Sequence, residues 1–339
     1  MTVGEREGVS SPETIGFWSR YCHQRFRYPD PDVHIDATAA ALAAHFRNSS
    51  YDVAIPVGLQ MTSLFVHYRD ALPVPMMLPP TVSFHVGSDK RLTFEHARSA
   101  GVPIPRTVPA ANWEELNPPI VFKHFQRGAV VAKTHDEAAA RVNGLGDRLP
   151  DYIAQEYIPG ENGFGYFGFF VGGREAAYFM HERIMQIPKE GGPSVVARAF
   201  SDDRLRALGR TLLESLNWHG AAMVEFKRSE RDGEFYLIEI NPKLWGSLDL
   251  AIQSGCNFPL WIAKAVVNGE APQPVNYKVG LTYQWIIPNG LKCFFRYPEF
   301  RKLFLRNLFA PNVRTDLRLL DPLPAAAGLF TMATNALRP

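Results

Sequence analysis

The sequence has few of the residues that mark a secreted, zinc-binding or membrane-spanning protein. Its three cysteines, Cys22, Cys256 and Cys293, are scattered, with no CxxC pair and no spacing typical of a zinc site. This usage fits a reducing compartment, where thiols stay free. The N-terminus is polar and lacks an apolar signal region, and no apolar run is long enough to cross a bilayer. We therefore expect a cytoplasmic protein with no membrane partner.

An excess of charge of one sign is also missing. The formal net charge is only +2, which argues neither for nor against a nucleic-acid partner. Internal repeats and low-complexity tracts are absent as well. With 46% hydrophobic and 21% charged residues, the composition is that of a globular protein with a sizeable core. A length of 339 residues exceeds one typical core, so we expect two or three domains.

The N-terminal residues 1–87 predict a small α/β domain. A buried strand over 51–57 lies between helices over 37–46 and 60–72, and Asp36 is the expected N-cap of the first helix. The chain starts in polar residues, so the first strand–helix unit of such a domain is expected to be missing.

Residues 88–274 predict short strands with compact helices between them. Ser88 is the expected N-cap of a helix that ends at Gly101. Strands are expected over 119–125, 130–133, 151–157, 164–171 and 176–180, with a helix over 203–217. The literal GxGxxG match at 163–168 is not a dinucleotide fingerprint, because a strand follows it and no helix does.

The last segment, residues 275–339, is basic, with nine Lys or Arg against three acids and with aromatic residues between them. Such a pattern could bind RNA. The favoured interpretation is a peripheral layer whose aromatics pack inward while the arginines cover the surface, and we expect no nucleic-acid partner.

The most informative pattern is a predicted β-hairpin with three oxygen-bearing side chains. Glu239 and Asn241 share one face of the second strand, and the Asp232-Gly233 turn brings Glu225 opposite Glu239. Two adjacent carboxylates repel unless a cation lies between them. Two Glu and one Asn form an all-oxygen set that suits Mg²⁺. The alternative is an exposed hairpin edge with solvated acids.

Two lysines upstream gain meaning from their order relative to this hairpin. Lys123 lies in an apolar strand, where an ammonium needs an anion, either a structural acid or a ligand. Lys90 opens the helix after Asp89, where an exposed, solvated lysine is the simpler interpretation. Neither residue is specific alone.

The ordered set resembles the ATP-grasp superfamily, in its carbamoyl-phosphate-synthase-like branch of carboxylate–amine ligases. It consists of Asp89-Lys90, the GVPIP that ends the helix, Lys123, Gln155 to Glu161, Glu225, and Glu239-Ile-Asn241-Pro-Lys243-Leu-Trp-Gly-Ser. The resemblance implies two α+β subdomains clasping ATP, preceded by a reduced Rossmann-like domain. The implied boundaries are 1–87 for that domain, 88–157 for the central subdomain, 158–274 for the C-terminal subdomain with the metal site, and 275–339 for an extension.

The resemblance also implies roles for single residues. Lys90 and Lys123 would contact the ATP phosphates. Glu225, Glu239 and Asn241 would hold Mg²⁺, or Mn²⁺ in its place, with two ions bridging the phosphates. The adenine pocket would be lined by Gln155, Glu156, Tyr157 and Ile158. The backbone of Glu156 and Ile158 would form hydrogen bonds with the base. Glu161, or Asn162 one residue on, would bind the ribose hydroxyls.

Arg183 and Lys243 are the implied catalytic residues. Arg183, followed by Gly191-Gly192-Pro193-Ser194, would stabilise the acyl-phosphate oxyanion, although a structural ion pair is the alternative. Lys243 stands where the family usually has Arg, so it keeps the charge but loses the bidentate fork. The sequence departs from the family in two further ways: the glycine-rich loop is reduced to Gln126-Arg127-Gly128, and Met223 replaces an arginine found in some members.

The implied reaction is formation of an acyl phosphate from a substrate carboxylate, followed by attack of an amine to give an amide, in biosynthesis of a small peptide-like metabolite. Positioning and electrostatics would dominate, so no Ser–His–Asp set is expected. Two alternatives remain: a carboxylase-type enzyme that activates bicarbonate, and an ATP-binding regulatory module without turnover. Small-molecule substrates and a homodimer are the expected partners; the sequence does not name the carboxylate or the amine.

Overall fold

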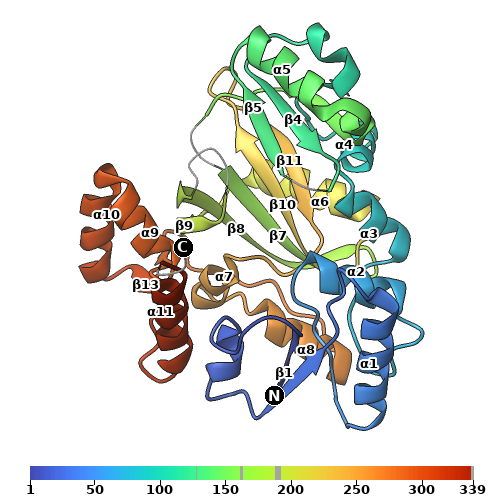
Figure 1. Ribbon diagram of the computed structural model, residues 1–339, viewed down its shortest axis with the longest axis vertical. Coiled ribbons are helices and arrows are strands. Elements are labelled where there is room, and N and C mark those ends of the chain that lie inside the picture. Colours follow the sequence, from blue (N-terminus) through green and yellow to red (C-terminus); the bar gives the residue numbers. More distant parts are fainter. Residues whose placement is uncertain (127, 161–162, 188–191, 337–339) are drawn as a thin grey trace.

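The computed structural model describes residues 1–126, 128–160, 163–187 and 192–336. The described chain contains three β-sheets of two, seven and four strands, each flanked by helices (Figure 1). The four-stranded sheet and its helices lie at one end of the molecule, the N-terminal elements lie at the other, and the seven-stranded sheet lies between them. None of the described helices combines the length and apolar character needed to cross a membrane.

The N-terminal part is built from two parallel strands, β1 (Thr2–Arg6) and β2 (Gln24–Tyr28), and the helices α1 (Ile35–Arg47), α2 (Leu59–His67) and α3 (Thr81–Ser88). The prediction that the first strand is missing was wrong, because β1 forms it. The segment between β1 and β2 holds a short 3₁₀ helix, η1 (Ile15–Trp18), in place of an α-helix.

Two local predictions in this part were also wrong. The apolar segment 51–57 is not a strand: it runs as extended coil, tied to its neighbour through the Ala54 N–H, which donates to Pro75 O. Helix α1 begins two residues earlier than expected, with His34 at the N-cap position. Asp36 lies inside the helix, where its carboxylate accepts a hydrogen bond from the Tyr68 hydroxyl at 2.5 Å.

The four-stranded sheet has the order β3-β6-β4-β5, from Thr107–Pro109, Tyr152–Glu156, Ile120–His124 and Ala129–Ala132. The helix α4 (Lys90–Ser99) precedes it; α5 (His135–Leu145) and the 3₁₀ helices η2 (Ala110–Glu115) and η3 (Gly146–Asp151) complete it. The N-cap of α4 is Asp89 rather than Ser88. Asp89 accepts a hydrogen bond from the Leu92 N–H, which satisfies a free donor of the first turn, whereas Ser88 ends α3.

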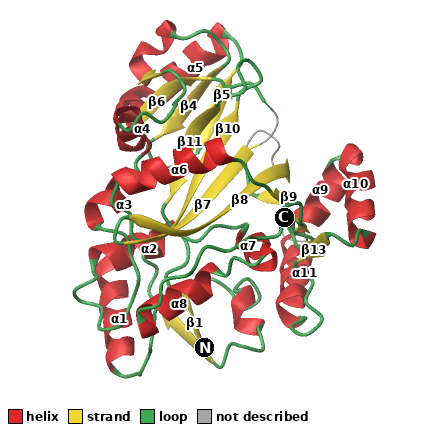
Figure 2. Cartoon of the chain, turned by 180° about the vertical axis from the view of Figure 1, so that it is seen from behind, coloured by secondary structure: helices red, strands yellow, loops and turns green. Residues whose placement is uncertain are grey.

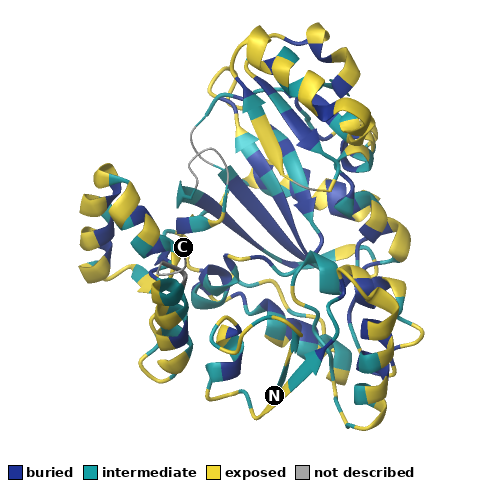
Figure 3. Cartoon of the chain, in the orientation of Figure 1, coloured by how far each residue is buried: buried dark blue, intermediate teal, exposed yellow. Residues whose placement is uncertain are grey.

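The seven-stranded sheet has the order β11-β10-β7-β8-β9-β12-β13. Its strands are β7 (Gly163–Val171), β8 (Arg174–Gln186), β9 (Ser194–Ala199), β10 (Gly220–Arg228), β11 (Phe235–Asn241), β12 (Thr282–Gln284) and β13 (Val313–Thr315). One face packs on α6 (Asp203–Ser215), through Tyr166, Val224 and Leu212. Part of the other face packs on α7 (Leu248–Ser254) and α8 (Phe258–Asn268), and the central strand β7 is buried over most of its length (Figure 3).

The expected C-terminal extension, residues 275–339, contributes to the outer edge of the large sheet. Its residues supply β12 and β13 to the large sheet, and α9 (Asn289–Arg296), α10 (Pro298–Phe309) and α11 (Leu323–Ala336) beside it (Figure 2). Phe300 and Phe304 pack inward as predicted, but Phe295 and Phe309 face solvent, 70% and 86% exposed. The predicted domain boundaries at 87, 157 and 274 stay predictions.

Candidate active site

The predicted hairpin forms in the predicted register. β10 and β11 are antiparallel, and Glu225 is the direct partner of Glu239. Val224 and Ile240 face the α6 side, where both are buried in the apolar core, so the two acids face the opposite side. Asn241, two residues beyond Glu239, pairs with Met223 and lies on the same face of the hairpin as the two acids. The alternation of β-strand side chains thus places the three oxygen-bearing groups together.

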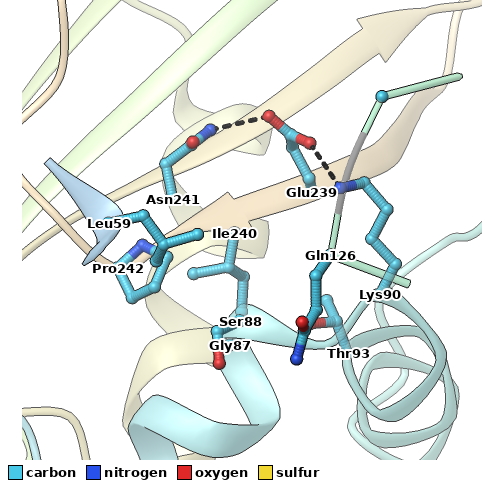
Figure 4. Close-up of a pocket in the computed structure, with 11 residues that line it drawn as sticks. Leu59, Gly87, Ser88, Lys90, Thr93, Gln126, Glu239, Ile240, Asn241 and Pro242 are labelled. Carbon is cyan, nitrogen blue, oxygen red and sulfur yellow. Dashed lines mark hydrogen bonds and ion pairs between the residues drawn. The ribbon is translucent and has the colours of Figure 1, made fainter. Parts of the chain in front are cut away.

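Glu239 lies between a cation and an amide. Lys90 Nζ, at the start of α4, is 3.3 Å from Glu239 Oε2, and the Asn241 amide donates a hydrogen bond to Glu239 Oε1 at 2.9 Å. Figure 4 shows these three side chains pointing toward one another. They line a cavity of about 290 Å³ together with Leu59, Gly87, Ser88, Thr93, Gln126, Gly128, Ile240 and Pro242.

Glu225 has a cation of its own. Arg183, on β8, donates a hydrogen bond through Nη2 to Glu225 Oε2 at 2.6 Å, and its Nη1 donates to Gln186 at 3.3 Å. The side chains of Arg183 and Glu225 are 16% and 14% exposed, so this is a largely buried ion pair. Gly163, on the intervening strand β7, leaves room for this pair, because a Cβ at that position would lie only 3.4 Å from Arg183 Cδ.

The two acids differ in their electrostatic surroundings. Burial raises the pKa of Glu225; Arg183 offsets this in part, and the neighbouring Glu239 adds to the rise. Burial also opposes ionisation of Glu239, but Lys90, the Asn241 amide and Lys123 outweigh it, so the pKa of Glu239 lies below its usual value. Adjacent carboxylates are therefore stable here only because two cations of the chain neutralise them.

Lys123 and Lys243 complete a cationic surround. Lys123, on β4, is 6% exposed; its Nζ donates to Ile238 O at 3.3 Å and lies 5.1 Å from the centre of the Phe94 ring. Burial lowers the pKa of Lys123 to about 8, although Glu239 opposes this. Burial also lowers the pKa of Lys243, against the attraction of Glu239 and Glu225. Cations outnumber acids, so the site has positive charge available for an anion.

The predicted adenine segment lies at the end of β6. Gln155 is 1% exposed, and its amide donates to Thr107 Oγ1 at 2.7 Å, while its Oε1 has no hydrogen-bond partner among the described residues. A buried acceptor without a donor is costly, and a ligand N–H would satisfy it. The Glu156 N–H already donates to Arg106 O. Tyr157 lies under Lys227, 4.4 Å from Nζ to the ring centre, and Ile158 is buried.

The structure therefore brings together seven of the predicted residues around the hairpin: Lys90, Lys123, Arg183, Glu225, Glu239, Asn241 and Lys243. Gln155 to Ile158 follow on the strand next to Lys123, since β6 pairs with β4. Glu161 and Asn162, the predicted ribose ligands, lie outside the described residues, as do Arg127 and Gly191. No cluster of three His, Cys, Asp or Glu occurs within the described ranges, and the hairpin set is two acids and an amide.

Sequence reasoning missed part of the cavity wall. Leu59 comes from α2 and Thr93 from α4, and both line the cavity with the hairpin. Neither carries a motif, and only the packing of α3 and α4 against β11, with α2 against α3, places them there. Gln126 and Gly128, noted in the sequence as a reduced loop, do border the cavity.

The sheets and helices that surround this arrangement of acids and lysines define a class of fold: the chain has the ATP-grasp fold. A family model described as "ATP-grasp in the biosynthetic pathway with Ter operon" matches residues 181–287. That span contains Arg183, both hairpin strands and Lys243.

Similar structures share the fold at low sequence identity. An L-amino acid ligase from Bacillus licheniformis has a TM-score of 0.60 and 17% identity, covering 73% of this chain and 64% of that chain. The biotin carboxylase domain of the 2-oxoglutarate carboxylase of Hydrogenobacter thermophilus, a dimer solved with MgADP, ADP and bicarbonate, has a TM-score of 0.64 and 13% identity, covering 83% and 68%.

Among curated proteins, acetyl-CoA carboxylase 1 of Arabidopsis thaliana is 39% identical over 64 residues, which is 19% of this chain and 3% of that protein. The chain thus spans a small fraction of the curated relative that it matches.

Proposed function

We propose that this protein is an ATP- and Mg²⁺-dependent ligase that activates a substrate carboxylate as an acyl phosphate and couples it to an amine. The observation that carries the proposal is the opposed pair Glu225–Glu239, in which each acid pairs with a cation from a different element. Two acids facing one another, with lysines in excess around them, match the demands of a metal–nucleotide complex.

The residues present fit Mg²⁺. Glu225, Glu239 and Asn241 are hard oxygen donors on one face of the hairpin, and the two carboxylates lie directly opposite each other. When bound, the metal would supply charge neutralisation between the phosphates. Mn²⁺ could replace Mg²⁺ with the same donors. Two ions are the expected number.

The chain's own residues would then orient the reactants. Lys90 and Lys123 would bind the phosphates, with Lys123 charged below about pH 8. The orphaned Oε1 of Gln155 would accept a hydrogen bond from the adenine amine, beside the backbone of Glu156, Tyr157 and Ile158. Arg183, held by Glu225 in the ligand-free protein, would turn to the developing oxyanion, and Lys243 would neutralise the transferred group as a point charge.

A second candidate is activation of bicarbonate instead of an organic carboxylate. It is favoured by the likeness to the carboxylase domain solved with bicarbonate. An ATP-binding module without turnover is the third possibility, suggested by Lys243 and Met223 in place of arginines, but the complete set of metal donors argues against it. A cytoplasmic location and a homodimer remain predictions.

The test is an ADP-release screen over paired carboxylates and amines, with bicarbonate as a separate arm. We expect ADP formation that needs both an amine and a carboxylate. Glu239→Gln should abolish it while leaving the circular dichroism spectrum unchanged. Arg91→Met is the control, because Arg91 follows Lys90 and pairs with no acid among the described residues, lying instead over the Phe125 ring. Dependence on bicarbonate alone would select the second candidate, and ATP binding without any ADP would refute the ligase.

A further inference from the structure

The outer side of α9 and α10 carries an apolar surface surrounded by cations. Phe295, Leu305, Leu308 and Phe309 are 70%, 49%, 41% and 86% exposed. Both helices project from the body of the protein (Figure 1), and their outer sides are mostly exposed (Figure 3). We call this set, with the cations Lys292, Arg296, Lys302 and Arg306, the outer face.

Helical periodicity separates this face from the one that folds the protein. On α10, Phe300, Phe304 and Asn307 recur at intervals of four and three and are buried. Leu305 and Phe309, four residues apart, lie on a different side of the helix and are exposed, and Leu308, at the border between the two sides, is 41% exposed. The apolar residues of the outer face therefore do not contribute to the core. Exposed apolar surface of this kind usually marks an interaction site.

The charge of the outer face restricts its partner. Residues 289–309 contain five cations and one acid, Glu299. Within the described part of the chain, the ion pairs found are made by other cations. Arg301 instead donates to the carbonyls of Phe294 and Phe295 and fixes the end of α9. A partner must therefore offer negative charge together with an apolar layer.

In contrast to the expectation from the sequence that the protein has no membrane partner, we propose that the outer face of α9 and α10 docks on an anionic phospholipid surface. Phe and Leu side chains would enter the boundary between headgroups and acyl chains, while Lys and Arg contact the anionic headgroups. A second copy of the chain would bring cations against cations. Nucleic acid would use the cations but leave Leu305 and Leu308 without a partner, because aliphatic side chains do not stack on bases. The projecting shape suits a flat surface, and the inference does not depend on the proposed reaction.

The experiment is co-sedimentation of the full chain with vesicles of phosphatidylcholine alone or mixed with phosphatidylglycerol. We expect binding only to the mixed vesicles, weakened by salt. Lys302→Gln/Arg306→Gln should weaken binding about 25-fold, since each cation near an anionic surface contributes roughly a factor of five. Leu305→Ser/Phe309→Ser should weaken it as well.

Control variants carry comparable changes elsewhere. Arg204→Gln/Arg210→Gln on α6 removes two cations, and Leu260→Ser replaces an exposed leucine on α8. Both should bind as the wild type does. The proposal would be overturned if the wild type did not bind, or if it bound equally well to uncharged vesicles. It would also be overturned if the outer-face variants bound as tightly as the controls. So would a dimer that the outer-face substitutions convert to monomers, because the face would then bind a second copy.

Discussion

Replacing Lys90 by methionine should make the site bind a divalent cation more tightly when no nucleotide is present. In the ligand-free protein Lys90 Nζ occupies the position of a counterion, 3.3 Å from Glu239 Oε2. At that separation the attraction is about 1 kcal/mol in water and about 5 kcal/mol at an effective dielectric constant of 20. The side chains are 15% and 29% exposed, so an intermediate value applies. Removing roughly 2 kcal/mol of competition corresponds to roughly a 30-fold gain in metal affinity.

The assay is a titration with Mn²⁺, followed by electron paramagnetic resonance, in the absence of ATP. Lys90→Met should bind Mn²⁺ more tightly than the wild type, while its affinity for ATP in the presence of Mg²⁺ falls, because the same lysine is expected to bind phosphate. Arg91→Met is the control and should change neither. Unchanged or weaker Mn²⁺ binding in Lys90→Met would show that Glu239 is not a metal ligand.

The charges and caps of the chain give four more predictions. The pKa of Lys123 is about 8 in the folded protein, below its usual value, so ATP affinity should fall as pH rises through about 8, and Lys123→Arg should remove this inflection in a calorimetric titration. Between about pH 8 and pH 10.4, the unfolded chain binds more protons than the folded one, because Lys123 loses its proton at a lower pH when it is buried. The free energy of unfolding, measured by chemical denaturation, should therefore rise over that interval in the wild type. It should not rise in Lys123→Met. Arg183→Met leaves Glu225 unpaired beside Glu239 and should lower the melting temperature without metal, with a larger gain on adding Mn²⁺ than the wild type shows; equal gains would contradict the assignment. Asp89→Ala removes the N-cap of α4 and should cost about 1 kcal/mol in urea denaturation, whereas Ser88→Ala should cost less.

The hairpin could be predicted because its information is local. Alternation fixes the faces of Glu239 and Asn241, and an Asp-Gly turn between two apolar strands fixes the register to within a residue. The pairing of Arg183 with Glu225 could not be predicted in the same way. Arg183 lies on β8, which reaches β10 only through β7, so the contact depends on the strand order of the sheet.

The errors have physical causes too. Segment 51–57 is apolar, but the structure gives it no strand partner, and Pro56 lacks a backbone donor. β1 and β2 could not be recognised in the sequence, because Thr2–Arg6 and Gln24–Tyr28 contain several charged residues. Both strands lie at the edge of a two-stranded sheet, where charged side chains can reach solvent. Ser88 and Asp89 are both good N-caps, and only the hydrogen bond from Leu92 separates them.

The order of strands in the large sheet also has a consequence for synthesis of the chain. β9 ends at Ala199, but its outer neighbour β12 begins only at Thr282. At ribosomal rates of about 5–20 residues per second, β9 would wait roughly 4 to 17 seconds for that neighbour. During this interval the free edge of β9 can pair with another nascent chain. The edge is apolar, because Val195 and Val196 are fully buried in the finished fold. Chains that stop before β12 should therefore aggregate, even though every proposed catalytic residue is already present in them.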